Sequence, residues 1–164
     1  MTISQTITHS VQVRRNVPAP PERVWRALVE PSQAGMWFAA LANITAERGG
    51  AHELYWQPES PEHNSTIGCR ITAIAPCRYL AFTWRGPDEL NVIMNDGDPP
   101  PPPTHVTITL ASTEAGTDVN VRHTGFGHDD GWSEAAIWHE RSWIACLDNL
   151  EAMLDGQPLP HPWR

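Results

Sequence analysis

The chain has 164 residues and a formal net charge of −8, which suits one domain with a sizeable core and excludes the clustered cations that a nucleic-acid or anionic-membrane surface needs. All eleven basic residues are arginine, so a lysine base and Schiff-base chemistry are excluded. Three scattered cysteines predict no disulfide framework and no zinc site. With no signal-peptide pattern and no apolar run of spanning length, we expect a cytoplasmic protein.

The first half of the chain predicts one strand, two helices and four more strands. Alternation in 10–17 places three valines and Arg15 on one face of a strand, and the prolines that follow it suit the first turn of a helix. Pro31 ends that helix, and a second short helix follows at 33–37. Four strands are then predicted at 42–47, 51–57, 67–75 and 78–84.

A proline-rich loop at 86–104 interrupts this pattern. Its five consecutive prolines favour a stiff polyproline II stretch, which we interpret as a rigid surface connection; docking to an SH3-like partner is the alternative. Two further strands are predicted at 105–112 and 117–123. The core then covers 10–155, and 157–164 forms a short tail of a single domain spanning 1–164.

The strongest signal is a long amphipathic helix at 131–154. Asp129 and Asp130 are candidate N-caps, and Gly156 supplies a stop. Its buried stripe is predicted to hold Trp132, Ala136, His139, Trp143, Leu147, Leu150 and Leu154. Large apolar side chains on the outer side suggest an interface, namely Ile137, Trp138 and Ile144.

The order of these elements predicts an α+β architecture. Consecutive strands joined by short turns pair antiparallel, and about seven of them can curl around one helix. We therefore expect a curved antiparallel sheet that encloses the long helix, with two short helices after the first strand. Any cavity should lie between the sheet and the helix.

Several landmarks in this order resemble one known family. They are the segments 24–28, 49–50, 76–84, 116–117, 124–126 and 139–143. Together they are similar to proteins related to the C-terminal domain of the activator of heat-shock protein 90 ATPase, in the START-like (SRPBCC) superfamily. The resemblance implies a helix-grip fold with a deep, largely apolar cavity used for hydrophobic ligands. Since no second domain is expected before Val11, a co-chaperone role has little support.

The concave face of such a fold supplies the candidate ligand-binding residues. They are Leu54, Trp56, Ile71, Phe82, Trp84, Val119, Val121, His123, Trp132, Ala136, His139 and Trp143. Their apolar rings suit a flat or aromatic ligand, although the same rings could simply fill the core. His52, His123 and His139 are the candidate catalytic residues, because a neutral imidazole can act as general acid or base.

Three functions remain open at this level. The first is non-enzymatic binding of a small hydrophobic or aromatic molecule. The second is a polyketide cyclase or aromatase-like enzyme that uses one of the three histidines. The third is a chaperone cofactor, homodimer or other protein-interaction module. No nucleotide-binding motif, nucleophile elbow or metal-ligand spacing occurs, so we expect no cofactor and no metal.

Overall fold

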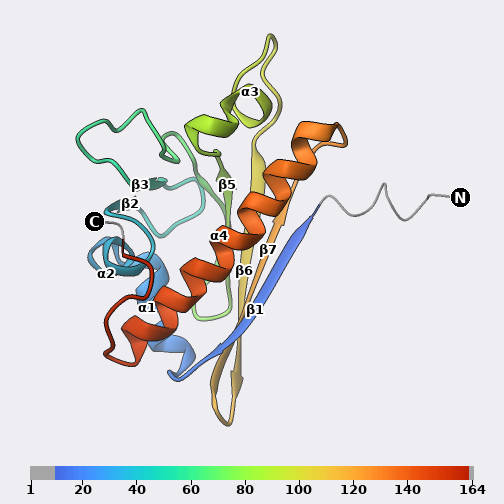
Figure 1. Cartoon of the computed structure of the whole chain (residues 1–164). Coiled ribbons are helices and arrows are strands. Elements are labelled where there is room, and N and C mark those ends of the chain that lie inside the picture. Colours follow the sequence, from blue (N-terminus) through green and yellow to red (C-terminus); the bar gives the residue numbers. More distant parts are fainter. Residues whose placement is uncertain (1–9, 163–164) are drawn as a thin grey trace, which may run out of the picture.

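The computed structural model describes residues 10–162 and contains two antiparallel sheets flanked by helices (Figure 1). The strands are β1 (Val11–Val17), β2 (Leu41–Ile44), β3 (His52–Tyr55), β4 (Ile71–Ala75), β5 (Tyr79–Trp84), β6 (Thr104–Thr113) and β7 (Gly116–Thr124). The helices are α1 (Pro21–Val29), α2 (Pro31–Trp37), η2 (Asp88–Leu90), α3 (Asn91–Met94) and α4 (Asp130–Leu154). The predicted α+β helix-grip architecture is confirmed.

The larger sheet has the strand order β1-β7-β6-β5-β4, with every neighbouring pair antiparallel. Its strands form because buried and exposed residues alternate along them, as in β1, where Val11, Val13 and Val17 are buried. The β6–β7 hairpin closes at Gly116, whose φ is +138° and whose position would put a Cβ only 2.0 Å from the carbonyl oxygen of Val17. Glycine alone fits this turn.

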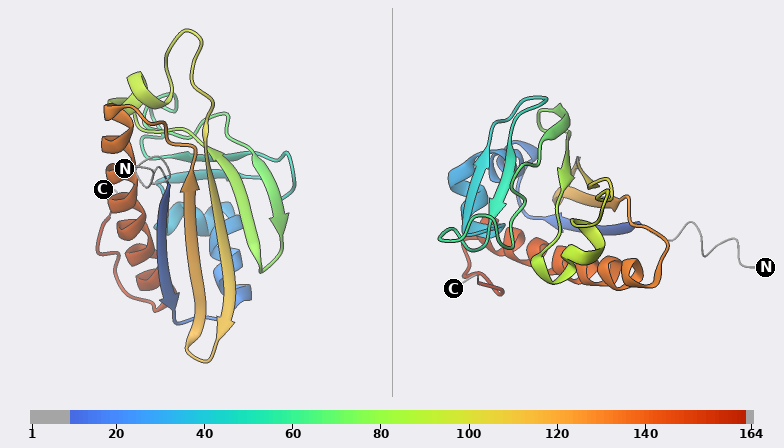
Figure 2. Two further views of the ribbon diagram at one scale, coloured as in Figure 1. Left: turned by 90° about the vertical axis from the view of Figure 1, so that its right-hand side faces the viewer. Right: turned by 90° about the horizontal axis from the view of Figure 1, so that it is seen from above.

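Strands β2 and β3 form a separate two-stranded sheet, so the seven strands are divided between two sheets. The sheets meet at a short bridge between Ala51 and Arg70, beside the turn at Gly49 and Gly50. Residues 67–70, predicted as strand, instead lie in a turn and that bridge. The break allows the smaller sheet to turn away from the larger one, which makes room for side chains between them (Figure 2).

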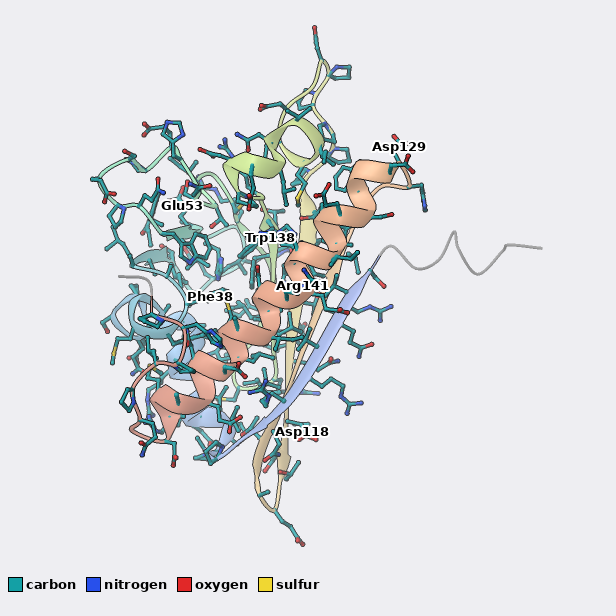
Figure 3. The ribbon with its side chains drawn as sticks, in the orientation of Figure 1. Phe38, Glu53, Asp118, Asp129, Trp138 and Arg141 are labelled. Atoms are coloured by element: carbon teal, nitrogen blue, oxygen red, sulfur yellow. The ribbon has the colours of Figure 1, made fainter. Side chains whose placement is uncertain are left out.

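Helix α4 lies along one face of the larger sheet and packs against β1, α2 and α3 (Figures 1 and 2). Arg15 of β1 forms ion pairs with two carboxylates of α4, at 2.7 Å to Asp148 and 3.1 Å to Glu151. Asp129 lies at the N-cap position, as predicted, but its side chain makes no capping hydrogen bond (Figure 3). The predicted stripe is confirmed from His139 onward.

The first turns of α4 depart from that stripe. Ala135 is fully buried there, whereas Trp132 and Ala136 are only half-buried. Ile137 and Ile144 are exposed, as predicted for the outer side. Trp138 is also exposed, at 36%, and its ring in addition flanks the cavity described below.

The segment after β5 is more ordered than a stiff proline connection. It forms η2 and α3, and buries Leu90 and Met94. The side chain of Asn95 closes the segment by accepting a hydrogen bond from the Gly86 N–H at 3.1 Å and donating one to the Gly86 carbonyl at 2.9 Å. The polyproline II interpretation concerned only the five prolines at 99–103, and the two short helices in the first half of 86–104, whose apolar side chains reach the core, were not predicted.

The tail after α4 is fastened by Asn149, which is fully buried. Its side chain accepts a hydrogen bond from the His161 N–H at 3.0 Å and donates one to the His161 carbonyl at 2.9 Å. None of the helices between residues 10 and 162 is both long and apolar enough to cross a lipid bilayer.

Candidate functional site

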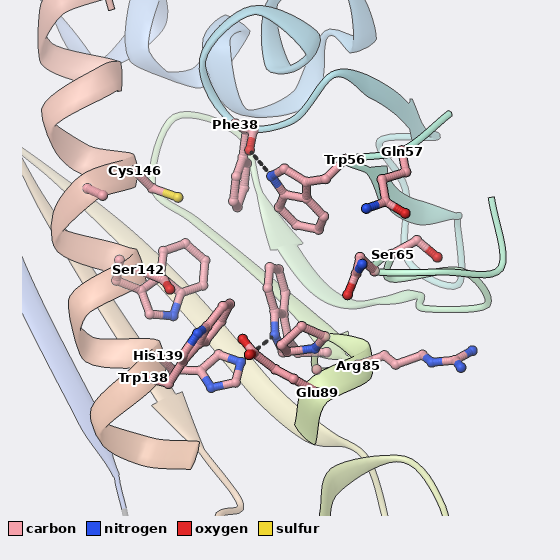
Figure 4. A pocket seen from close by; sticks show the side chains of 16 residues that line it. Phe38, Trp56, Gln57, Ser65, Arg85, Glu89, Trp138, His139, Ser142 and Cys146 are labelled. Atoms are coloured by element: carbon pink, nitrogen blue, oxygen red, sulfur yellow. Dashed lines mark hydrogen bonds between the residues drawn. The ribbon is translucent and has the colours of Figure 1, made fainter. Parts of the chain in front are cut away.

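A cavity of about 370 Å³ lies between α4, the end of β5 and the start of the 86–95 segment (Figure 4). This volume is in the range of small-molecule sites. Sixteen residues line it: Phe38, Trp56, Gln57, Asn64, Ser65, Trp84, Arg85, Gly86, Pro87, Glu89, Trp138, His139, Ser142, Trp143, Ala145 and Cys146. We call five of the buried members, Phe38, Trp84, His139, Trp143 and Cys146, the floor, and the solvent-reached Gln57, Arg85 and Glu89 the rim.

Trp84 is the centre of the floor. As the last residue of β5, it follows the inward positions of Leu80 and Phe82. Its ring lies 5.3 Å from that of Trp143, 6.1 Å from that of Trp56 and 6.2 Å from that of Phe38, measured between centroids. These distances are typical of interacting aromatic pairs, so the rings support one another around the cavity.

His139 is held as a neutral ring with a defined tautomer. An indole N–H can only donate, so the 3.1 Å bond from Trp84 Nε1 makes His139 Nε2 the acceptor (Figure 4). The opposite ring nitrogen, Nδ1, then carries the proton and donates to the Ala135 carbonyl at 2.8 Å. Burial lowers the pKa of His139 to about 4, against a weaker opposing effect of that backbone bond.

His123 lies next to His139, with 4.9 Å between ring centroids, but it has the other tautomer. Trp143 Nε1 donates to His123 Nδ1 at 3.1 Å, so Nε2 carries the proton and donates to the Thr104 hydroxyl at 2.8 Å. Burial, followed by the charges that His139 and His105 would carry, lowers its pKa well below the ordinary value. Both rings are therefore neutral at pH 7.

His52 is the third candidate histidine and is fully buried outside the cavity lining. Its ring is stacked on Phe82, with centroids 3.7 Å apart and planes inclined by 14°. Neither ring nitrogen has a hydrogen-bond partner among residues 10–162. Burial lowers the pKa of His52 to about 3. The structure therefore separates His52 from the pair formed by His123 and His139.

Two loops meet beside the rim and are joined by Asp88. The Asn64 N–H donates to the Asp88 carboxylate at 3.0 Å, and the Asp88 N–H donates back to the Asn64 side-chain oxygen at 2.9 Å. His63 Nδ1 lies 2.6 Å from the other carboxylate oxygen. The Asn64 N–H and then His63 hold the pKa of Asp88 below its ordinary value. We call this group the Asp88 clamp.

Of the candidate ligand-binding residues, the structure brings four together around the cavity: Trp56, Trp84, His139 and Trp143. Leu54, Ile71, Phe82, Val119, Val121 and His123 are buried in the core outside the cavity lining, while Trp132 and Ala136 lie half-buried near the start of α4.

Most of the remaining lining residues could not be found by periodicity. Phe38, Ser65 and the 85–89 segment lie in connections, where no repeating pattern shows which way a side chain points. Ser142 flanks the helix stripe, and so does Cys146. Its burial raises the thiol pKa to about 12, so it is a poor nucleophile.

No group of three or more histidine, cysteine, aspartate or glutamate side chains within residues 10–162 is arranged to hold a metal ion. Just before α4, burial separates His123 from the two aspartates at the start of the helix. His123 is enclosed and bonded to Trp143 and Thr104, whereas Asp129 and Asp130 are exposed at the start of the helix.

We next compared the chain with known protein families. A family model described as "Activator of Hsp90 ATPase homolog 1-like protein" matches residues 18–155. The chain belongs to this family. The resemblance noted in the sequence is thereby confirmed, including the START-like superfamily and its helix-grip fold. A comparison with curated proteins finds no match.

Solved structures of the same fold include several bacterial proteins. Protein MLL2253 from Mesorhizobium loti aligns with a TM-score of 0.72 and 24% identity, over 92% of this chain and 99% of that one. CalU16 from Micromonospora echinospora has a TM-score of 0.66 and 22% identity, over 94% and 82%. DynU16, a protein of the dynemicin biosynthetic locus, has a TM-score of 0.70 and 21% identity, over 95% and 51%. These similarities establish a shared fold.

Proposed function

We propose that this member of the activator of Hsp90 ATPase homolog 1-like family binds a small hydrophobic or aromatic molecule in the cavity beside α4. The observation that carries the proposal is the set of aromatic rings around one space of about 370 Å³, contributed by Phe38, Trp56, Trp84, Trp138 and Trp143. Buried apolar walls of this kind stabilise a ligand by removing its apolar surface from water. Solvent-reached polar side chains at the rim leave an entry path.

The same geometry favours binding over acid–base turnover. A general base needs an accessible lone pair, and the only acceptor nitrogen of His139 already receives the Trp84 N–H. The acceptor nitrogen of His123 is likewise bonded to Trp143, and His52 does not line the cavity. Proton abstraction by His139 would first require loss of a buried hydrogen bond. A cyclase-like reaction therefore lacks an available base among the three candidate histidines.

We further propose that the protein acts in the cytoplasm. Its support is the state of the three cysteines, all of which are unpaired thiols, with Cys69 and Cys146 buried. Buried thiols persist in a reducing compartment.

The test is calorimetric titration with 2-naphthol, a flat probe that is apolar except for one hydroxyl. Ala145 lines the cavity and is half-buried, so Ala145→Trp should fill the space and reduce affinity at least about tenfold, because overpacking displaces the ligand. Ile144→Trp is the matched control, since Ile144 is 43% exposed on the same helix and outside the lining. Equal affinity in both variants would contradict the proposal.

A further inference from the structure

The floor of the cavity contains several polar groups, but nearly all of them form hydrogen bonds within the protein. The Trp84 N–H donates to His139 Nε2, and His139 Nδ1 donates to a carbonyl of its own helix. The Trp143 N–H donates to His123 Nδ1. Trp84, His139 and Trp143 therefore present only ring edges and faces to the cavity, because their polar atoms already form hydrogen bonds within the protein.

The neighbouring groups follow the same pattern. The Trp56 N–H donates to the Phe38 carbonyl at 3.1 Å, and the N–H and carbonyl of Gly86 are both bonded to the side chain of Asn95. The hydroxyl of the buried Ser65 donates to the Pro61 carbonyl at 2.6 Å. At Cys146 only a weak thiol donor remains, which burial keeps protonated.

The rim has the opposite character. Gln57 and Glu89 are exposed, and Arg85 is half-buried, so their hydrogen-bonding groups reach water at the mouth of the cavity. In Figure 4 the Arg85 side chain extends away from the aromatic rings. Ser142, halfway down the wall on α4, is also partly reached by solvent. The cavity therefore changes from open polar groups at its mouth to aromatic rings with engaged polar atoms at its floor.

We infer that the cavity selects amphipathic ligands in one orientation: an aromatic or hydrocarbon end without hydrogen-bonding groups enters first, and the polar end stays at the rim beside Gln57, Arg85 and Glu89. This inference rests on the proposed function and adds the ligand class. A hydroxyl carried to the floor would lose its water partners and find no free acceptor stronger than the Cys146 sulfur, which is costly. A hydroxyl at the rim keeps its partners.

Two isomers of one compound test this orientation. In 2,3-dihydroxynaphthalene both hydroxyls lie at one end, so the other end is bare, whereas in 2,6-dihydroxynaphthalene each end carries one. We expect calorimetry to show binding of the 2,3 isomer that is about tenfold or more tighter, from the cost of one buried, unpaired hydroxyl. Composition and size are identical, so neither the number of hydroxyls nor the area of the rings accounts for the difference. Equal affinities, or tighter binding of the 2,6 isomer, would overturn the inference.

Two variants test whether the hydrogen bond in the floor causes the ratio of the two affinities. Trp84→Phe removes the N–H that occupies His139 Nε2 and leaves a free acceptor, while His139→Phe leaves the Trp84 N–H as a free donor. Each should improve binding of the 2,6 isomer relative to the 2,3 isomer and bring the ratio toward one. Circular dichroism identifies a variant that fails to fold, and the wild-type ratio then decides alone.

The outcomes separate the two proposals. If both isomers bind and the ratio is close to one in the wild type, the orientation is wrong but the cavity still binds aromatic molecules. If neither isomer binds, the proposed function fails, and the ligand class fails with it. If the wild-type ratio is large but neither folded variant changes it, the Trp84–His139 hydrogen bond is not its cause, and the inference from the floor is overturned.

Discussion

His52 shows how burial governs a single residue here. Its ring is enclosed and stacked on Phe82, and its two nitrogens have no partner within the described chain. The cost of charging such a ring lowers its pKa to about 3. Between that value and the ordinary value of 6.5, the unfolded chain binds a proton that the folded chain does not. The contribution of the neutral His52 ring to the free energy of unfolding is therefore fully present above about pH 6.5 and decreases as the pH falls toward about 3.

Replacement of His52 by phenylalanine should weaken this pH dependence. From pH 7 to pH 5, one histidine with these properties costs about 2 kcal/mol of unfolding free energy, so His52→Phe should lose about that much less than the wild type. Urea denaturation at both pH values measures the difference. Leu54→Met, a conservative change on the same buried strand face, is the control and should keep the wild-type dependence. An unchanged dependence in His52→Phe would contradict the account.

At the scale of elements, the Asp88 clamp joins two connections that are far apart in sequence. It links the loop before β4 to η2 through two backbone-to-side-chain hydrogen bonds and His63. Because Asn64 and Pro87 both line the cavity beside the clamp, opening it should widen the mouth. The lowered pKa of Asp88 keeps its carboxylate ionised at neutral pH, so the clamp is lost only as the pH falls below the ordinary value of 3.8.

Asp88→Ala should therefore change the kinetics of binding more than the affinity. Loss of these hydrogen bonds should speed both entry and release of 2-naphthol about fivefold or more. Stopped-flow fluorescence of the tryptophans measures both rates. Asp96→Ala removes an exposed carboxylate from the same segment and should leave them unchanged. The clamp has no gating role if the two variants behave alike.

These elements also show what the sequence could and could not predict. Alternation identified the strands, and helical spacing identified α4, because each pattern reports one buried face. The contribution of Trp138 to the cavity was not predicted, because α4 is approached on its flank by the 86–95 segment as well as by the sheet. Phe38 and Asn64 lie in connections, whose positions are set by tertiary contacts rather than by a repeating pattern.

At the scale of the whole molecule, the cavity exists because α4 is held at a fixed distance from the two sheets. Arg15 fastens its C-terminal half to β1, and Asn149 donates to the Trp37 carbonyl at 3.4 Å, which connects it to α2. The 86–95 segment covers its N-terminal half. These contacts leave the middle of the helix lining the cavity, where His139 and Trp143 also bond to side chains of β5 and β7.

A crystal structure of the protein grown with 2-naphthol tests this arrangement most directly. We expect electron density for the naphthalene rings between Trp84, Trp143 and Phe38, with the hydroxyl directed toward Arg85 and Glu89 at the rim. Side chains filling that space completely, with the probe absent or bound only on the outer surface of α4, would contradict the account.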